Sequence, residues 1–133
     1  CGLTIERLLA AYDIGRAINP KMIEGQIVGG FAQGLGGALM EEFIYDSRGQ
    51  PLALSLAAYL MPPALEMPEL DILPTPSTQN PLGIKGAGES GISPVGALLA
   101  SAIDDALGWP GAVTELPVTP MRLKKLIDQR PLQ

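Results

Sequence analysis

The stretch from Asn19 to Glu42 constrains the fold more than any other part of this sequence. Asn19 is of a type favoured just before a helix, and Pro20 suits a first helical turn, so the sequence predicts a helix from Pro20 to about Glu42. Its apolar residues recur at helical spacing, which predicts that one face packs in a core. That expected core face consists of Met22, Ile23, Ile27, Phe31, Leu35 and Leu39.

The same predicted helix is rich in glycine. Each glycine costs a helix about 0.5–1 kcal/mol relative to alanine, so this helix is not expected to be stable alone. Glycines repeated at helical spacing let another backbone or a flat ligand approach closely. We therefore expect tight packing around Gly25, Gly29, Gly30, Gly34, Gly36 and Gly37.

The strands expected in the rest of the chain are short. Residues 4–13 suit a strand, although a short helix remains an alternative, and residues 69–73 alternate like a second strand. Residues 43–46 and 52–55 flank a glycine turn and predict a β-hairpin. Residues 74–81, rich in proline and polar residues, predict a loop.

Two further helices are expected in the C-terminal half. Ser93-Pro94 and Thr119-Pro120 each read as a helix start, and the helices are expected to end at Gly108 and near Asp128. The apolar face of the first is expected to be Val95, Leu98, Leu99, Ala102, Ile103 and Leu107. The basic residues of the second, Arg122, Lys124, Lys125 and Arg130, are expected to be solvated. Together these elements predict an α+β fold in which the glycine-rich and C-terminal helices pack on a small mixed sheet.

Composition limits the classes of function. A chain of 133 residues with 47% hydrophobic content suits one domain, 1–133. A formal net charge of −5 with 9 Lys+Arg leaves no basic stripe for nucleic acid. One Cys and no His exclude a disulfide framework, a zinc finger or a His-based triad on this chain alone, so no metal ligands are expected. No apolar stretch reaches the length of a membrane span.

The segment Gly83–Gly91 is the first that suggests chemistry. Its glycines predict a turn whose backbone N–H groups converge on an anion ahead of a helix, and Glu89 is its only carboxylate. Glu89 is interpreted either as a mildly stabilising acid near a helix start or as a general base beside a bound cofactor. Gly86-x-Gly88-x-x-Gly91 also fits a dinucleotide-binding fingerprint, but a Pro-rich loop precedes it where that fingerprint requires a strand.

The second segment lies in the glycine-rich helix. Gln26, Gly30, Gln33 and Gly37 share one helical face, so two amides flank small residues and are suited to grip a flat polar ligand. The alternative is that these glutamines point to solvent.

Four motifs together resemble one family. They are DIGRAINP (13–20), EGQIVGGFAQGLGGALMEE (24–42), YLMPP (59–63) and GIKGAGESG (83–91). In order and spacing they are similar to the end of the molybdopterin-binding large subunit of the xanthine dehydrogenase, aldehyde oxidoreductase and carbon monoxide dehydrogenase family. The missing initiating Met and the much longer family subunit lead us to expect a C-terminal fragment, inactive by itself.

The resemblance implies specific roles. Glu89 matches the family's catalytic base, which accepts a proton so that water-derived oxygen can attack an electron-poor carbon of a small-molecule substrate. Gln26 and the segment Lys85, Gly86, Ala87 and Gly88 match residues that contact the molybdopterin cofactor. The implied cofactor carries molybdenum, in the cytosine dinucleotide form.

The resemblance also implies partners and a location. Iron–sulfur (2Fe-2S) and FAD subunits or domains, together with the remainder of the large subunit, are expected to complete a cytoplasmic oxidoreductase. A competing hypothesis is a non-catalytic assembly module whose glycine-rich helix packs tightly against a partner.

Overall fold

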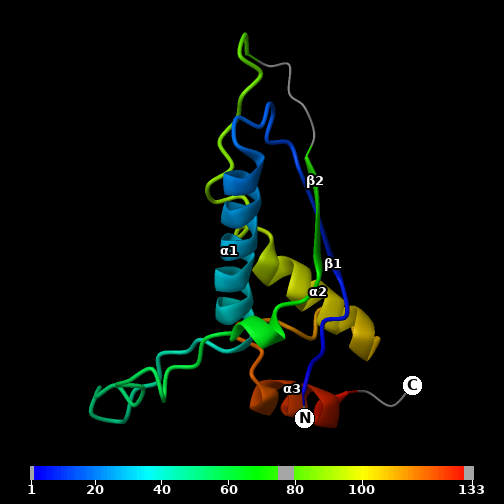
Figure 1. The fold of residues 1–133 in the computed structure, drawn as a ribbon. Coiled ribbons are helices and arrows are strands. Elements are labelled where there is room, and N and C mark those ends of the chain that lie inside the picture. The colour runs from blue at the N-terminus through cyan, green and yellow to red at the C-terminus, as the bar shows by residue number, and fades with distance from the viewer. Residues whose placement is uncertain (1, 75–79, 131–133) are drawn as a thin grey trace.

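The computed structural model describes residues 2–74 and 80–130, in which two α-helices pack with a two-stranded sheet and a third packs against the end of the second helix rather than on the sheet (Figure 1). The α+β class expected from the sequence is confirmed. Most of the predicted loop 74–81 falls outside these residues. In chain order the elements are β1 (Leu8–Tyr12), α1 (Pro20–Leu39), the 3-10 helix η1 (Ala64–Glu66), β2 (Leu70–Pro74), α2 (Val95–Leu107) and α3 (Pro120–Gln129).

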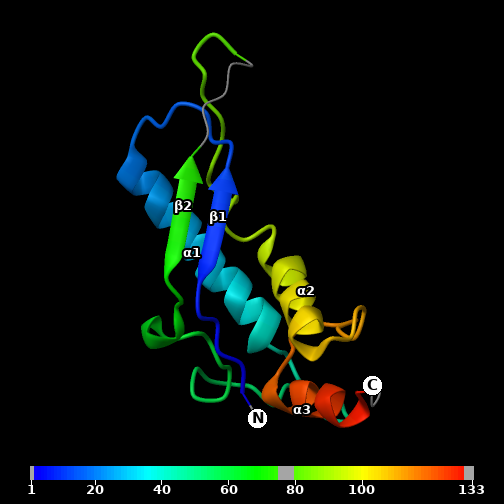
Figure 2. The same cartoon turned by 90° about the vertical axis from the view of Figure 1, so that its right-hand side faces the viewer.

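The two strands are parallel. Leu8 lies opposite Leu70 and Tyr12 lies opposite Pro74, so within the described residues the sheet is parallel rather than mixed. Parallel neighbours require a crossover connection, and α1 lies in it, against one face of the sheet (Figure 2). Both predicted strands are confirmed, and the first is shorter than expected because β2 pairs with only five of its residues.

Helix α1 begins where the sequence predicts. The Asn19 side chain accepts a hydrogen bond from the Met22 N–H at 3.2 Å, which satisfies one of the free N–H groups of the first turn. Ile27, Phe31 and Leu35 are buried as expected. The prediction that Met22 belongs to the core is wrong, since its side chain is 66% exposed.

Only some of the α1 glycines are closely packed: Gly30 and Gly34 face the start of α2, and Gly36 faces Glu41 and Pro62. A Cβ atom at Gly34 would lie 2.6 Å from the Cβ of Val95, and one at Gly30 would lie 3.0 Å from the backbone N of Ile92. The start of α2 therefore packs directly on the backbone of α1. Gly29 has open space where its Cβ would be.

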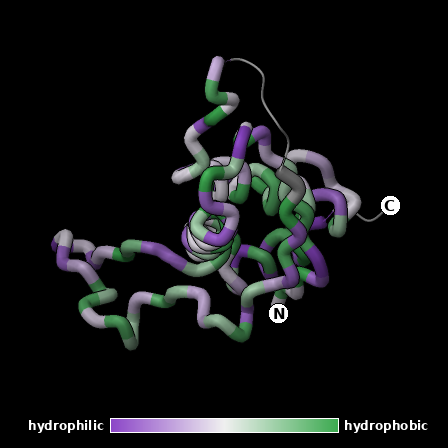
Figure 3. The backbone as a smooth tube through the Cα atoms, turned by 45° about the horizontal axis from the view of Figure 1, so that its top comes forward, coloured by the Kyte–Doolittle hydropathy of each residue, from purple (hydrophilic) through white to green (hydrophobic). Residues whose placement is uncertain are grey.

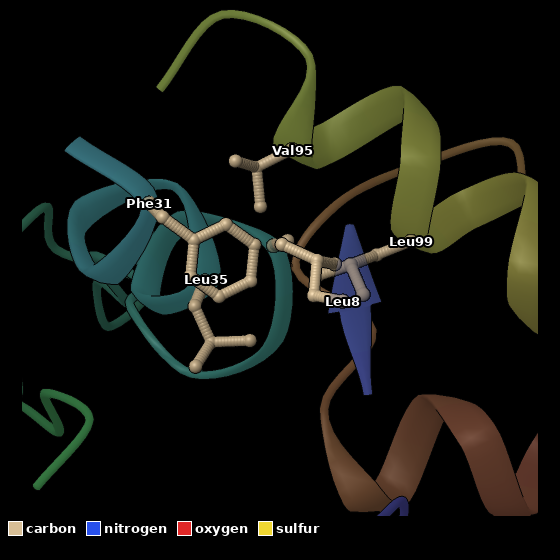
Figure 4. Packing of buried hydrophobic residues seen from close by; sticks show 6 residues of the cluster. Leu8, Phe31, Leu35, Val95 and Leu99 are labelled. Atoms are coloured by element: carbon tan, nitrogen blue, oxygen red, sulfur yellow. The ribbon is translucent and has the colours of Figure 1, made fainter. Parts of the chain in front are cut away.

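Most of the buried apolar residues form two clusters, of which Figure 4 shows the first. One joins β1, α1 and α2 through Leu8, Phe31, Leu35, Ala38, Val95 and Leu99. The other joins the end of α2 to α3 through Ile103, Leu107, Ala112, Val118 and Leu123. Leu39 packs against both clusters, so the end of α1 connects them.

Residues 40–62, here called the apolar arm, project from the end of α1 (Figure 3). The hairpin predicted here is reduced to one antiparallel bridge, Tyr45 with Pro51. At the base of the arm the Tyr59 hydroxyl donates to the Glu41 carboxylate at 2.8 Å. This hydrogen bond is the main cause that raises the pKa of Tyr59 above its usual 10.0.

Helices α2 and α3 are confirmed near their predicted bounds. Gly108 ends α2 with φ 60°, a left-handed conformation that glycine adopts without strain. The prediction that Leu98 is in the core is wrong, because it is 42% exposed. Arg122 is not simply solvated, since its guanidinium donates to the Glu42 carboxylate at 2.6 Å. No helix among the described residues is long and apolar enough to cross a membrane.

Candidate functional site

An open groove of about 600 Å³ lies between the first turns of α1 and the glycine-rich segment that precedes α2. The segments that form it are far apart in the sequence, and the fold brings them together. From α1 and the turn before it come Arg16, Ile18, Asn19, Met22, Ile23 and Gln26, and from the glycine-rich segment come Ile84, Lys85, Gly86, Ala87 and Gly88.

The glycine-rich segment is attached to the turn that follows β1. Gly15 and Ile84 form an antiparallel bridge, and the Arg16 N–H donates to the Gly83 carbonyl at 2.5 Å. Gly15 has φ 63°, and a Cβ there would lie 2.3 Å from the Gly83 carbonyl oxygen. Only glycine suits this close crossing of two backbones.

Asn80 shapes the entry to the segment. Its side-chain amide donates to the Ile84 carbonyl at 2.7 Å, and its side-chain oxygen accepts from the N–H groups of Leu82 at 3.1 Å and Ile84 at 3.3 Å. A single asparagine thus satisfies three backbone groups of a tight turn, a use for which its short amide side chain is well suited.

An ion pair fixes the segment from its side. The Lys85 ammonium donates a hydrogen bond to the Asp13 carboxylate, which also accepts from the Gly15 N–H at 3.3 Å. The hydrogen bond from Lys85 is the main cause that holds the pKa of Asp13 below its usual 3.8. Desolvation acts in the opposite direction and raises this pKa, whereas the hydrogen bond from the Gly15 N–H and the positive charge of Lys85 lower it further. Asp13 therefore stays ionised at neutral pH and keeps its partner.

The predicted cofactor-contact residues meet at this groove. Gln26 lies on its α1 side, and its exposed side chain makes no hydrogen bond within the described part of the chain. Gly86 and Gly88 have open space where a Cβ would be, so their backbone is accessible from the groove. The arrangement offers one amide and a stretch of bare backbone to a flat polar molecule.

Two expectations for these segments are corrected. Of the segment's four glycines only Gly83 adopts positive φ, and the N–H groups of Gly83 and Ile84 already donate to Asn80, so no anion-binding nest is left open there. Gly91 instead packs on α1, where its Cβ would lie 2.2 Å from the Ile27 carbonyl oxygen. Gln26 and Gln33 lie on one face of α1 as predicted, but only Gln26 lines the groove, so the two amides do not grip a ligand together there.

Glu89 does not line the groove. It lies in the turn before α2, its side chain is exposed, and its backbone carbonyl accepts from the Ser93 hydroxyl at 3.2 Å. Its carboxylate has no hydrogen bond or ion pair among residues 2–74 and 80–130. Glu89 is the residue directly after Gly88, so it lies next to the groove along the chain.

Sequence reasoning missed two residues that organise the site. Asp13 lay within a recognised motif, but its charge was not connected to Lys85 because the two are distant in the sequence. Asn80 was assigned only to a polar loop, although an Asn just before Pro81 is a common turn signal. In the described ranges no three His, Cys, Asp or Glu side chains are grouped to hold a metal ion.

Comparisons with known proteins identify the family of this chain. The family model described as a molybdopterin cofactor-binding domain matches residues 1–68. The chain belongs to this molybdopterin-binding family. The 6-hydroxypseudooxynicotine dehydrogenase complex subunit gamma of Paenarthrobacter nicotinovorans is 47% identical over 125 residues, which are 92% of this chain and 16% of that protein.

Other relatives extend the family across several activities. The carbon monoxide dehydrogenase large chain of Afipia carboxidovorans is 37% identical, covering 92% of this chain and 16% of that protein. The crystal structure of quinoline 2-oxidoreductase from Pseudomonas putida 86 superimposes with a TM-score of 0.81 at 41% identity, again over 92% of this chain and 16% of the other. The chain thus spans about a sixth of the molybdopterin-binding relatives that it matches, and the resemblance found in its motifs is confirmed.

Proposed function

We propose that this chain is one part of a molybdopterin-dependent hydroxylase and contributes cofactor contacts and a catalytic base. The observation that carries the proposal is the groove, which brings Gln26 together with the segment Lys85–Gly88 across a long separation in the sequence. Family membership supports the same assignment.

The groove fits a cofactor of this kind. The Gln26 amide can both donate and accept hydrogen bonds, and the backbone of Gly86 and Gly88 is unobstructed on the open side. Molybdopterin brings its own sulfur ligands for the metal, which suits a site whose described residues group no metal-binding side chains. When bound, the cofactor supplies the redox chemistry for hydroxylating an electron-poor carbon.

Glu89 is proposed as the base. Its carboxylate is exposed and unpaired within the part of the chain that the structure describes, and it directly follows the groove-lining Gly88. A carboxylate in this position can take up a proton from a bound water or hydroxyl group and release it to solvent.

The rest of the enzyme is also part of the proposal. The relatives carry names such as complex subunit gamma, large subunit and large chain. We infer that this chain is the C-terminal part of a longer molybdopterin-binding subunit, which works with iron–sulfur (2Fe-2S) and FAD subunits on a small-molecule substrate in the cytoplasm. The cytosine dinucleotide form of the cofactor belongs to the same proposal.

The first test is the molybdenum and nucleotide content of the complete polypeptide that carries this segment, purified from its native host. Near-stoichiometric molybdenum with released cytidine nucleotide is the expected result. An intact assembly without molybdenum would refute the proposal and leave the assembly-module hypothesis.

A second test addresses the base. In the complete enzyme, Glu89→Gln should lower turnover by about 10²–10⁴-fold, the usual contribution of a general base, while molybdenum content stays unchanged. Glu6→Gln is a matched control, because Glu6 is an exposed glutamate that does not line the groove. Normal turnover in Glu89→Gln would remove Glu89 from the mechanism.

The competing hypotheses have less support. The close contacts of Gly30 and Gly34 are with α2 and the turn before it, so the tight glycine packing is used inside the chain rather than reserved for a partner. A dinucleotide fingerprint requires a strand that leads directly into its glycines, whereas β2 ends at Pro74, well before Gly86.

A further inference from the structure

Three contacts connect the groove-lining glycine-rich segment to the turn after β1. They are the bridge of Gly15 with Ile84, the hydrogen bond from the Arg16 N–H to the Gly83 carbonyl, and the ion pair of Asp13 with Lys85. The first two are backbone contacts at the start of the segment. The ion pair is a side-chain contact, and it lies further along the segment, at Lys85. The residues from Lys85 to Gly88 line the groove.

The position of Lys85 limits what its charge can do. Its side chain is 28% exposed and that of Asp13 is 45% exposed, so the pair is partly shielded from water. Lys85 has the length to reach an anionic ligand, but its ammonium is already hydrogen-bonded to a carboxylate. A paired ammonium has little net charge to offer an anion.

We propose that Asp13 is a positioning residue that, through Lys85, fixes the Lys85–Gly88 backbone along the groove. In this role Lys85 contributes its backbone to the cofactor and uses its positive charge to hold the segment in place. The inference rests on the proposed function, because the bound molecule that benefits is the molybdopterin cofactor.

Two roles for Lys85, holding the segment through Asp13 or binding an anionic group of the cofactor by its charge, predict opposite effects of removing the Asp13 charge. If Lys85 binds an anionic group of the cofactor itself, removing the Asp13 charge frees the ammonium and cofactor retention is unchanged or improved. If Asp13 positions the segment, removing either charge weakens retention to a similar extent. The double variant is then no worse than either single one, because both substitutions break the same contact.

The experiment uses the complete polypeptide that contains this segment. The variants are Asp13→Asn, Lys85→Met and the two combined, with Lys85→Arg as the conservative replacement that keeps the pair. Lys21→Met is the matched control, because Lys21 is an exposed lysine without an ion pair among the described residues. Two quantities are measured: amide hydrogen exchange of Arg16, Gly83 and Ile84, whose N–H groups are hydrogen-bonded where the segment is attached, in cofactor-free protein, and the molybdenum retained after prolonged dialysis.

We expect exchange at Arg16, Gly83 and Ile84 to rise roughly two- to fivefold in Asp13→Asn, in Lys85→Met and in the double variant, as for loss of a partly exposed ion pair. Molybdenum retention should fall in the same three proteins. Lys85→Arg and Lys21→Met should behave like the unsubstituted protein in both measurements.

Other results would refute either the positioning role of Asp13 or the proposed function of the chain. Loss of molybdenum in Lys85→Met but not in Asp13→Asn would show that Lys85 acts by its charge and would refute the positioning role. Unchanged exchange in all variants would refute it as well. Unsubstituted protein that never contains molybdenum would refute the proposed function, whereas the exchange measurement would still decide whether Asp13 orders the segment.

Discussion

Two glycines of α1 have opposite surroundings although they have the same helical backbone. Gly29 has open space where a side chain would begin, whereas a Cβ at Gly34 would lie 2.6 Å from the Cβ of Val95. Val95 is buried and β-branched, so it cannot rotate away from the new atom. The sequence alone does not distinguish these two positions.

Substitution by alanine should therefore have opposite signs at the two glycines. Gly29→Ala should raise the free energy of unfolding of the 133-residue chain by roughly 0.5–1 kcal/mol, because alanine loses less backbone entropy in a helix. Gly34→Ala should lower it by about 1–3 kcal/mol through overpacking against Val95. Urea denaturation followed by circular dichroism measures both. A stabilised Gly34→Ala protein would contradict the close contact.

Residues of the candidate site were predictable to different degrees. Gln26 and Lys85–Gly88 were identified from motifs, and the structure brings them to one groove. Asp13 and Asn80 were not identified, because their roles consist of contacts to distant residues or to a turn geometry. Motif spacing carries no information on such contacts.

At the scale of elements, α2 depends on the turn that follows it. Gly108 ends the helix in a left-handed conformation, and the Asp104 carboxylate accepts hydrogen bonds from the N–H groups of Gly111 at 2.7 Å and Val113 at 2.9 Å. One side chain from the last turn of α2 therefore fixes the chain that leads toward α3. This also keeps Trp109 against the second core cluster.

Asp104→Ala should lower the free energy of unfolding by about 1–2 kcal/mol, because two N–H groups lose a charged acceptor. Asp105→Ala is the matched control, since the neighbouring carboxylate makes no side-chain hydrogen bond in the described residues. Hydrogen exchange at Gly111 and Val113 should accelerate only in the first variant. Equal effects of the two substitutions would show that the turn does not depend on Asp104.

Helix ends that were predicted from a signal of one or two neighbouring residues are confirmed. The starts of α1 and α3 follow their Asn-Pro and Thr-Pro pairs, and α2 stops at its glycine. The hairpin at 43–55 was overestimated, because its apolar residues find no core and only one bridge forms. Local turn signals do not suffice for strands that nothing covers.

At the scale of the whole molecule, the apolar arm stands out because its large apolar side chains are not packed in the core. Arg122 of α3 anchors its base, since its guanidinium pairs with Glu42 and donates to the Pro117 carbonyl at 2.8 Å. Beyond that anchor its large apolar side chains remain exposed: Phe43, Ile44, Tyr45, Leu52, Leu54, Leu56, Leu60 and Met61. Exposed apolar surface of this extent promotes association of a protein in water.

We expect the isolated 133-residue chain to self-associate through this arm. The double substitution Leu54→Ser and Leu56→Ser should shift sedimentation velocity profiles toward the monomer, because both side chains are more than three-quarters exposed, at 78% and 77%. Leu65→Ser, at an exposed leucine in η1 outside the arm, should have a smaller effect. A monomeric unsubstituted chain at the same concentration would contradict the expectation.

The sequence by itself determined the three α-helices, the two strands of the sheet, the α+β class and the family, because caps, periodicity and ordered motifs act over short distances along the chain. The tertiary structure decided the parallel pairing of β1 with β2, the glycines that are packed, the pairing of Asp13 with Lys85, and the exclusion of Glu89 from the groove lining. These features depend on which distant segments meet. Contacts of that kind follow from the packing of the buried face of α1 with β1 and α2, and local patterns do not specify which distant segments pack together.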